Sequence, residues 1–141
     1  MTYLLDVNCL LALVDETHPF HSKVSNWYHS HVALSWSTCP LTENGFVRVI
    51  SLPSYSYRRL PIADAQQTLI HLCNQPGHQF WPDDLSIREV NQIPTIPGPK
   101  AITDLYLLAL AVKHHGKFAS LDASIDPSLV PGGMQAFHLV E

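Results

Sequence analysis

Four acidic side chains in this sequence stand where metal-assisted chemistry would need them. Asp6 ends the apolar run TYLLD, and Asp122 ends a similar run, KFASLD, near the other end of the chain. Glu43 and Asp104 each lie in or near the first turn of an expected helix. A carboxylate beside buried segments is costly to desolvate unless another group compensates its charge. Four acids gathered in one place would repel each other unless cations lay between them.

The chemistry expected of such a site is hydrolysis at phosphorus. Hard oxygen ligands favour Mg²⁺ or Mn²⁺ over zinc. Two such ions can hold the attacking and the leaving oxygens of a phosphodiester in line. Each acid taken alone also has a simpler explanation, because Glu43 or Asp104 would stabilise a helix N-terminus, by about 0.3–1 kcal/mol. Asn8 alone is typical of a helix cap and Asp6 of a turn, so the conjunction carries the metal hypothesis.

The pattern of apolar residues predicts alternating strands and helices. Strands are expected at residues 2–6, 32–36, 78–81 and 117–122, with a fifth at 134–140. Helices are expected at residues 8–15 (with Asn8 as the N-cap), 18–31, 40–51, 62–75 and 101–115. Such alternation indicates an α/β fold, a three-layer α/β/α domain with a central, mostly parallel sheet of four to five strands. Residues 1–141 are expected to form a single domain.

The position of the acids relative to these elements suggests one shared site. In a doubly wound sheet, ligands bind beyond the carboxyl ends of the strands, where the strand order reverses. If the first and fourth strands are neighbours, Asp6 and Asp122 lie side by side at that edge. The proline-rich segment 93–100, IPTIPGPK, cannot be helix or central strand, so we interpret it as a long functional loop rather than an interdomain linker.

Composition narrows the class of protein. The 141 residues carry 8 basic and 12 acidic side chains, a net charge of −4, which argues against a broadly basic nucleic-acid binder. The three cysteines form no C-x-x-C pair and indicate free thiols in a reducing cytosol. No apolar stretch approaches the roughly 18 residues that span a bilayer, and no signal peptide is indicated, so we expect a cytoplasmic protein without membrane association.

Five segments, in order, resemble those of PIN-domain ribonucleases, and most closely the VapC-type toxins of type II toxin–antitoxin systems. The segments are LLDVNCLLAL, the HPFH helix, TCPLTENGFVRV, ITDLYLLALA and FASLD. The resemblance carries the family's acidic quartet onto Asp6, Glu43, Asp104 and Asp122. Asn8 matches a frequent family asparagine, and Thr103 and Ser120 match small hydroxyl residues beside the last two acids. Where many relatives have arginine after the fourth acid, this chain has Ala123, which leaves open whether Asp122 binds metal directly or through water.

The resemblance implies an Mg²⁺- or Mn²⁺-dependent endoribonuclease that cleaves RNA and is neutralised by a cognate VapB-type antitoxin. A homodimer is also expected, and the low charged fraction of 14% agrees with a partner-covered surface. The helix with Trp27 and Tyr28 and the segment around Phe46 are candidate dimer surfaces. One alternative is a non-catalytic PIN-like module that binds RNA or protein. A haloacid-dehalogenase-type phosphotransfer enzyme is disfavoured because Asn8 stands where that family needs a second aspartate.

Overall fold

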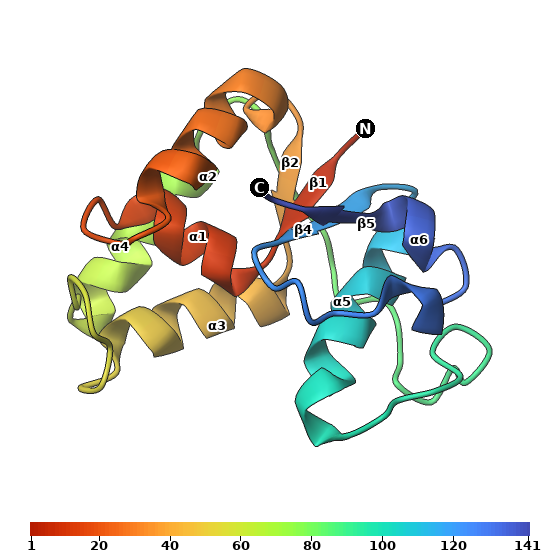
Figure 1. Cartoon of the computed structure of the whole chain (residues 1–141). Coiled ribbons are helices and arrows are strands. Elements are labelled where there is room, and N and C mark those ends of the chain that lie inside the picture. Colours follow the sequence, from red (N-terminus) through yellow and green to blue (C-terminus); the bar gives the residue numbers. More distant parts are fainter.

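A computed structural model describes residues 1–141 and contains a five-stranded, wholly parallel sheet (Figure 1). The strand order is β3-β2-β1-β4-β5, so β1 has β2 on one side and β4 on the other. The strands are β1 (Tyr3–Leu5), β2 (Trp36–Thr38), β3 (His78–Phe80), β4 (Lys117–Ser120) and β5 (Phe137–Leu139). The predicted α/β class is confirmed, and the first and fourth strands are neighbours, which is the condition for Asp6 and Asp122 to lie side by side. The strand order reverses between β1 and β4, which makes their carboxyl ends the expected binding edge.

Helices cover both faces of the sheet, as the three-layer prediction requires. The longer helices are α1 (Val7–Val14), α2 (His21–Trp27), α3 (Pro40–Ser51), α4 (Ile62–Cys73) and α5 (Ile102–Lys113). Short helical segments are η1 (Tyr28–Val32), η2 (Pro99–Ala101), η3 (Pro127–Leu129) and α6 (Gly133–Ala136). Figure 1 shows α1 to α4 on one side of the strands and α5 and α6 on the other. No helix combines the length and the apolar character that crossing a membrane requires.

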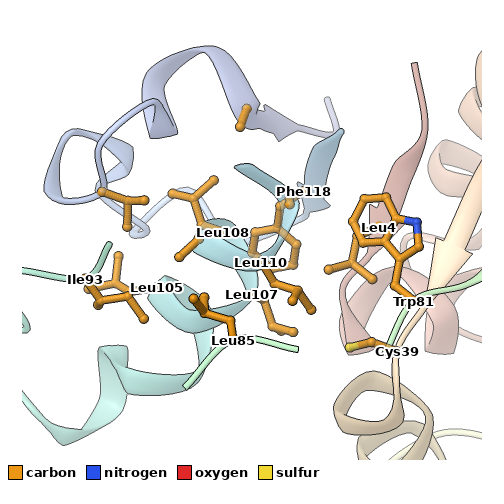
Figure 2. Close-up of a cluster of buried hydrophobic side chains, with 14 of the residues drawn as sticks. Leu4, Cys39, Trp81, Leu85, Ile93, Leu105, Leu107, Leu108, Leu110 and Phe118 are labelled. Atoms are coloured by element: carbon orange, nitrogen blue, oxygen red, sulfur yellow. The ribbon is translucent and has the colours of Figure 1, made fainter. Parts of the chain in front are cut away.

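Two hydrophobic clusters, one on each face, hold the layers together. Side chains of a strand point alternately to opposite faces, so Leu4 joins the cluster around α5 whereas Leu5 joins the cluster around α1 and α3. Phe118 and Ala119 divide between the clusters in the same way. Figure 2 shows the first cluster, in which leucines of α5 meet Phe118, Leu4 and Trp81. Helix α5 is apolar nearly all round because it contributes much of this cluster.

Several predicted boundaries were wrong in instructive ways. Helix α1 is capped by Asp6 and not by Asn8, because the Asp6 carboxylate accepts the hydrogen bond of the Val7 amide at 2.8 Å. The expected strand at 134–140 is instead the short helix α6 followed by β5. Tyr28 and Phe46 are buried in the hydrophobic core, so these two side chains cannot contribute to the dimer surface suggested for their segments, whereas Trp27 is partly exposed.

Helices α1 and α3 approach closely near the carboxyl edge of the sheet. A Cβ atom on Gly45 of α3 would come within 2.6 Å of the Val7 side chain at the start of α1. Glycine at this position therefore lets the second turn of α3 pack directly against the first turn of α1. As a result, the residues that follow β1 and β2 are held against each other.

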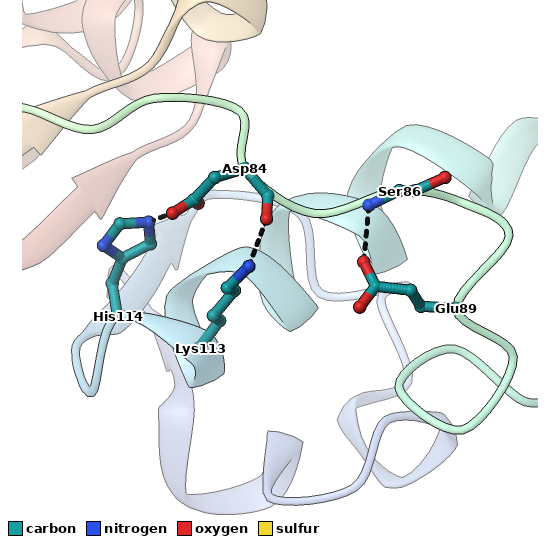
Figure 3. Close-up of polar contacts among 5 residues, drawn as sticks. All are labelled: Asp84, Ser86, Glu89, Lys113 and His114. Carbon is teal, nitrogen blue, oxygen red and sulfur yellow. Dashed lines mark hydrogen bonds and ion pairs between the residues drawn. The ribbon is translucent and has the colours of Figure 1, made fainter.

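The proline-rich region between β3 and α5 is anchored to the body of the protein. Figure 3 shows that Asp84 binds the end of α5, where its carboxylate lies 2.8 Å from the His114 ring and its carbonyl accepts from Lys113. Trp81 stacks on the same histidine, with ring centroids 4.6 Å apart. Trp81, Leu85 and Ile93 are buried in the α5 cluster. The segment is thus a packed loop that leads into the first turn of α5, where Asp104 lies.

A buried carboxylate holds the loop between α3 and α4. Asp15, which ends α1 and is 2% exposed, accepts hydrogen bonds from the Tyr55 hydroxyl (2.7 Å) and the Arg58 amide (3.1 Å). It also accepts from the amide and hydroxyl of Thr17. Burial alone would raise the pKa of Asp15, but these hydrogen bonds outweigh it and the pKa is lowered. The folded state therefore depends on the ionised form of this residue.

Replacing Asp15 by alanine should destabilise the fold by about 2–4 kcal/mol, because four part-buried hydrogen bonds lose their charged acceptor. Since the pKa of Asp15 is lowered on folding, its contribution should be present above the unfolded-state pKa and lost as the pH falls through the folded-state value. Urea unfolding at neutral and acidic pH measures both effects. Glu16→Ala, at the exposed neighbouring residue, is the control, and an equal loss in both variants would contradict this role.

Candidate active site

The side chain of Ser120 ties the end of β1 to the end of β4. Its hydroxyl donates to Asp6 Oδ2 at 2.6 Å and accepts hydrogen bonds from Asn8 Nδ2 and from the Asp122 amide, each at 3.1 Å. The Asn8 carbonyl oxygen accepts from the Leu121 amide at 3.2 Å. Asn8 therefore does not cap a helix but joins the two strand ends. These hydrogen bonds fix the orientation of the Asp6 carboxylate and the position of the backbone from Ser120 to Asp122.

Three of the four predicted acids lie near one another at this edge. Burial raises the pKa of Asp6, and the charge of Asp122 raises it further, while hydrogen bonds from Ser120 and the Val7 amide oppose the rise. The pKa of Asp104 is raised to about 6, first by its partial burial and then by the negative charges of Asp6 and Asp122. The neighbouring negative charges thus destabilise the ionised forms of Asp6 and Asp104, an effect that a bound cation would reverse.

A pocket of about 250 Å³ opens beside these acids. Asp104 and Asp122 line it, and Lys100 and Pro97 from the preceding loop contribute to its wall. Asp122 is oriented by its own loop, since its carboxylate accepts hydrogen bonds from the Ser124 amide (2.9 Å) and hydroxyl (2.6 Å). The structure leaves Ala123 exposed next to it. The orientation of Asp122 in this chain therefore comes from serine rather than from a following arginine.

The fourth predicted acid faces a different set of side chains. Glu43 lies in the first turn of α3, as expected, but its carboxylate accepts a 2.6 Å hydrogen bond from the Thr38 hydroxyl. It also lies within 4.8 Å of ligand atoms of Cys73 and His78. Glu43 is not among the charges that raise the pKa of Asp6 or Asp104. In this structure Glu43 thus belongs to the β2–β3 side of the edge, and its role as a metal ligand beside the aspartates stays a prediction.

Sequence reasoning did not pair Cys73 with His78. Both side chains are partly buried and flank the turn between α4 and β3, five positions apart in the sequence. A cysteine and a histidine close together in the sequence are a signal for a metal site, but neither residue type fits an Mg²⁺ site.

Thr103, predicted beside Asp104, is exposed in the first turn of α5.

Comparisons with known proteins decide the family. The family model for the PIN domain matches residues 3–126, which is most of the chain. The chain belongs to the PIN domain family. Curated relatives from Mycobacterium tuberculosis include Ribonuclease VapC44, 42% identical over 134 residues that cover 94% of each chain. Ribonuclease VapC38 is 39% identical over 122 residues, 86% of each chain, and Ribonuclease VapC39 is 34% identical over 134 residues.

Two solved structures share the fold at low sequence identity. A chain of VapBC2 from Rickettsia felis, solved with a DNA fragment from its promoter, superposes with a TM-score of 0.61 at 10% identity and covers all of both chains. A chain of FitAB, solved with the IR36 DNA fragment, gives 0.60 at 18% identity and covers 85% of each. The parallel sheet with helices on both faces is thus the fold of this PIN domain, as the sequence predicted.

Mutual repulsion at the site predicts an unusual pH dependence for the metal-free PIN domain. A carboxyl whose pKa is raised on folding favours the folded state at low pH, and this contribution is lost as the pH rises through about 6. Asp104→Asn should therefore raise the melting temperature in chelator by a few degrees near neutral pH. The gain should vanish near pH 4, where the native carboxyl is also neutral. Glu16→Gln removes an equal but exposed charge as the control, and a pH-independent effect of Asp104→Asn would contradict the coupling.

Proposed function

We propose that this PIN domain is a metal-dependent endoribonuclease of the VapC type that hydrolyses RNA phosphodiester bonds. The observation that carries the proposal is the gathering of Asp6, Asp104 and Asp122 at the β1–β4 switch point, with the pKa of Asp104 raised by its neighbours. The names of the curated relatives support an RNA-hydrolysing activity.

The chemistry of the donor set fits Mg²⁺ or Mn²⁺. The aspartates offer only carboxylate oxygens, which are the ligands these hard cations favour. A cation here would also relieve the repulsion that raises the pKa of Asp6 and Asp104. We expect Asp6 and Asp104 to hold the ion and Asp122 to take part directly or through water. Glu43 is the fourth candidate ligand and would need another side-chain rotamer to join them.

In the proposed mechanism each residue has a defined task. Bound Mg²⁺ or Mn²⁺ would supply Lewis-acid activation of water and of the scissile phosphate. Ser120, by donating to Asp6, holds that carboxylate in one orientation and leaves its other oxygen beside the start of α1. Asn8 keeps the ends of β1 and β4 at a constant separation. The Lys100 ammonium on the pocket wall would attract the RNA backbone to an otherwise negative site.

Asp6→Asn and Asp104→Asn should each reduce RNA cleavage by more than about a hundredfold, because each removes a metal-binding charge. Neither change should weaken the fold in chelator, since each relieves repulsion among the remaining acids. Cleavage of a single-stranded RNA with Mg²⁺ or Mn²⁺, together with circular dichroism, measures both. Asp64→Asn, an exposed acid on α4, is the charge-matched control. Full activity in either site variant would refute the assignment.

We further propose a VapB-type antitoxin as the partner that neutralises the enzyme. The acids and the adjoining pocket form a negative recess that suits an Arg or Lys side chain from a bound peptide. Assembly of the PIN domain as a homodimer stays a prediction.

Changing the inserted basic residue of the cognate antitoxin to alanine should weaken inhibition, and excess Mg²⁺ should compete with the native antitoxin. Both effects follow because cation and side chain would share the same carboxylates. Titrating cleavage activity with each antitoxin at several Mg²⁺ concentrations tests this. An antitoxin that inhibits equally at every Mg²⁺ concentration would contradict the mechanism and leave the nuclease proposal intact.

A further inference from the structure

We propose a second metal site, formed by Glu43, Cys73 and His78, that binds a zinc-like divalent ion. These residues come from three elements that meet at the β2–β3 side of the sheet: α3, the end of α4 and the start of β3. All three side chains are partly buried. A carboxylate oxygen, the Cys73 sulfur and a His78 ring nitrogen all lie within 4.8 Å of one another, and no other three acidic, cysteine or histidine side chains in the structure do so.

The spacing of the ligand atoms is close to what tetrahedral coordination needs. With zinc–ligand bonds of about 2.0–2.3 Å, neighbouring ligand atoms of a tetrahedron stand about 3.3–3.7 Å apart. The donor atoms of Glu43, Cys73 and His78 lie within 4.8 Å of one another, so side-chain rotation has to bring them closer together to bind one ion. Three protein ligands leave the fourth position of the ion for water or another small ligand.

The Thr38 hydroxyl contacts all three proposed ligands in this structure. Its buried hydroxyl lies 2.6 Å from Glu43 Oε2, 2.7 Å from His78 Nε2 and 3.9 Å from Cys73 Sγ. Because the Thr38 hydroxyl donates to the carboxylate, the neutral imidazole donates to it from Nε2. An ion that binds Nε2 would replace this hydrogen bond, and the ring proton would move to Nδ1. Trp36 packs edge-on against the same ring, with centroids 4.8 Å apart. The site is thus held in place by side chains that do not bind the ion.

The mixture of donors selects the kind of ion. Sulfur and imidazole favour Zn²⁺, Co²⁺ and similar ions over Mg²⁺, which binds the oxygen-only site of the three aspartates. Binding releases the Cys73 thiol proton to solvent, so a thiolate and a carboxylate together balance the charge of a divalent ion. The chain would therefore bind two classes of metal at two different places: the aspartates at the carboxyl ends of β1 and β4, and the Glu43, Cys73 and His78 site on the β2–β3 side of the sheet.

Glu43 links this second site to catalysis. It is the fourth acid of the proposed nuclease, and an ion held by Cys73 and His78 would keep its carboxylate on the β2–β3 side. Zinc should then lower Mg²⁺-dependent cleavage. This consequence, unlike the binding itself, rests on the proposed nuclease function.

Cobalt titration of the full chain, reduced and freed of metal, tests the binding. Thiolate bound to Co²⁺ gives an intense charge-transfer band in the near ultraviolet, and Cys73 is the thiol that can supply it, since Cys9 and Cys39 are fully buried. We expect one Co²⁺ per chain, displaced by Zn²⁺ and not by Mg²⁺. Cys73→Ser should abolish the band, and His78→Gln or Glu43→Gln should weaken binding by about tenfold or more.

The matched control is His71→Gln, which removes an exposed histidine from the same helix as Cys73 and should leave the titration unchanged. Circular dichroism of each metal-free variant shows whether it is folded. Because the three ligand variants change three different residues, misfolding of one variant leaves the other two as tests of the site. Absence of the band in the wild type, or a band that persists in Cys73→Ser, would overturn the site.

A second measurement addresses the link to cleavage. The ratio of RNA cleavage with and without one equivalent of Zn²⁺ should fall well below one in the wild type and stay near one in Cys73→Ser. An equal ratio in both proteins would refute the link, because zinc would then act elsewhere. A wild type that cleaves no RNA even without zinc would refute the nuclease proposal, while the cobalt titration would still decide the second site.

Discussion

The pairing of β1 with β4 is the contact on which the rest of this site depends. Register places Leu5 opposite Ala119, so the next residues of both strands leave the sheet at the same level. The Ser120 hydroxyl then bridges from β4 to the Asp6 carboxylate, and Asn8 returns the connection from the other side. Without this parallel pairing, Asp6 and Asp122, which are separated by most of the chain, would not lie at the same edge of the sheet.

The same arrangement opposes folding electrostatically. Asp6 is almost completely buried and has no cationic partner. Its negative charge contributes to the raised pKa of Asp104. The core on both sides must compensate for this, and it does so with fully buried leucines of α5 and with Phe118, Leu4 and Trp36. Stability supplied by the two clusters thus maintains a concentration of negative charge, which is the feature that the proposed metal-dependent function would use.

Glu43 lies between two groups of polar side chains that come from different strands of the sheet. The ends of β1 and β4 contribute oxygen ligands, whereas the start of β3 and the end of α4 contribute a nitrogen and a sulfur. Glu43 stands between the two sets because α3 follows β2, the strand that lies between β1 and β3. Its hydrogen bond to Thr38 decides which set it joins in this structure.

Local sequence determined the elements and the residue types of the site. Alternating apolar runs and amphipathic stretches were enough for the α/β class. Acids that follow strands or open helices led to the prediction of one site with Asp6, Glu43, Asp104 and Asp122, and the structure brings three of them together without Glu43. Tertiary structure alone decided which helix-start residue acts as the cap and which strand ends touch, since Asn8 is drawn to Ser120, 112 residues away. It also decided that Glu43 faces Thr38 and that Cys73 and His78 share its surroundings. Hydrogen bonds between distant segments leave no periodic trace in the sequence, so side-chain direction at the site had to come from the packed fold.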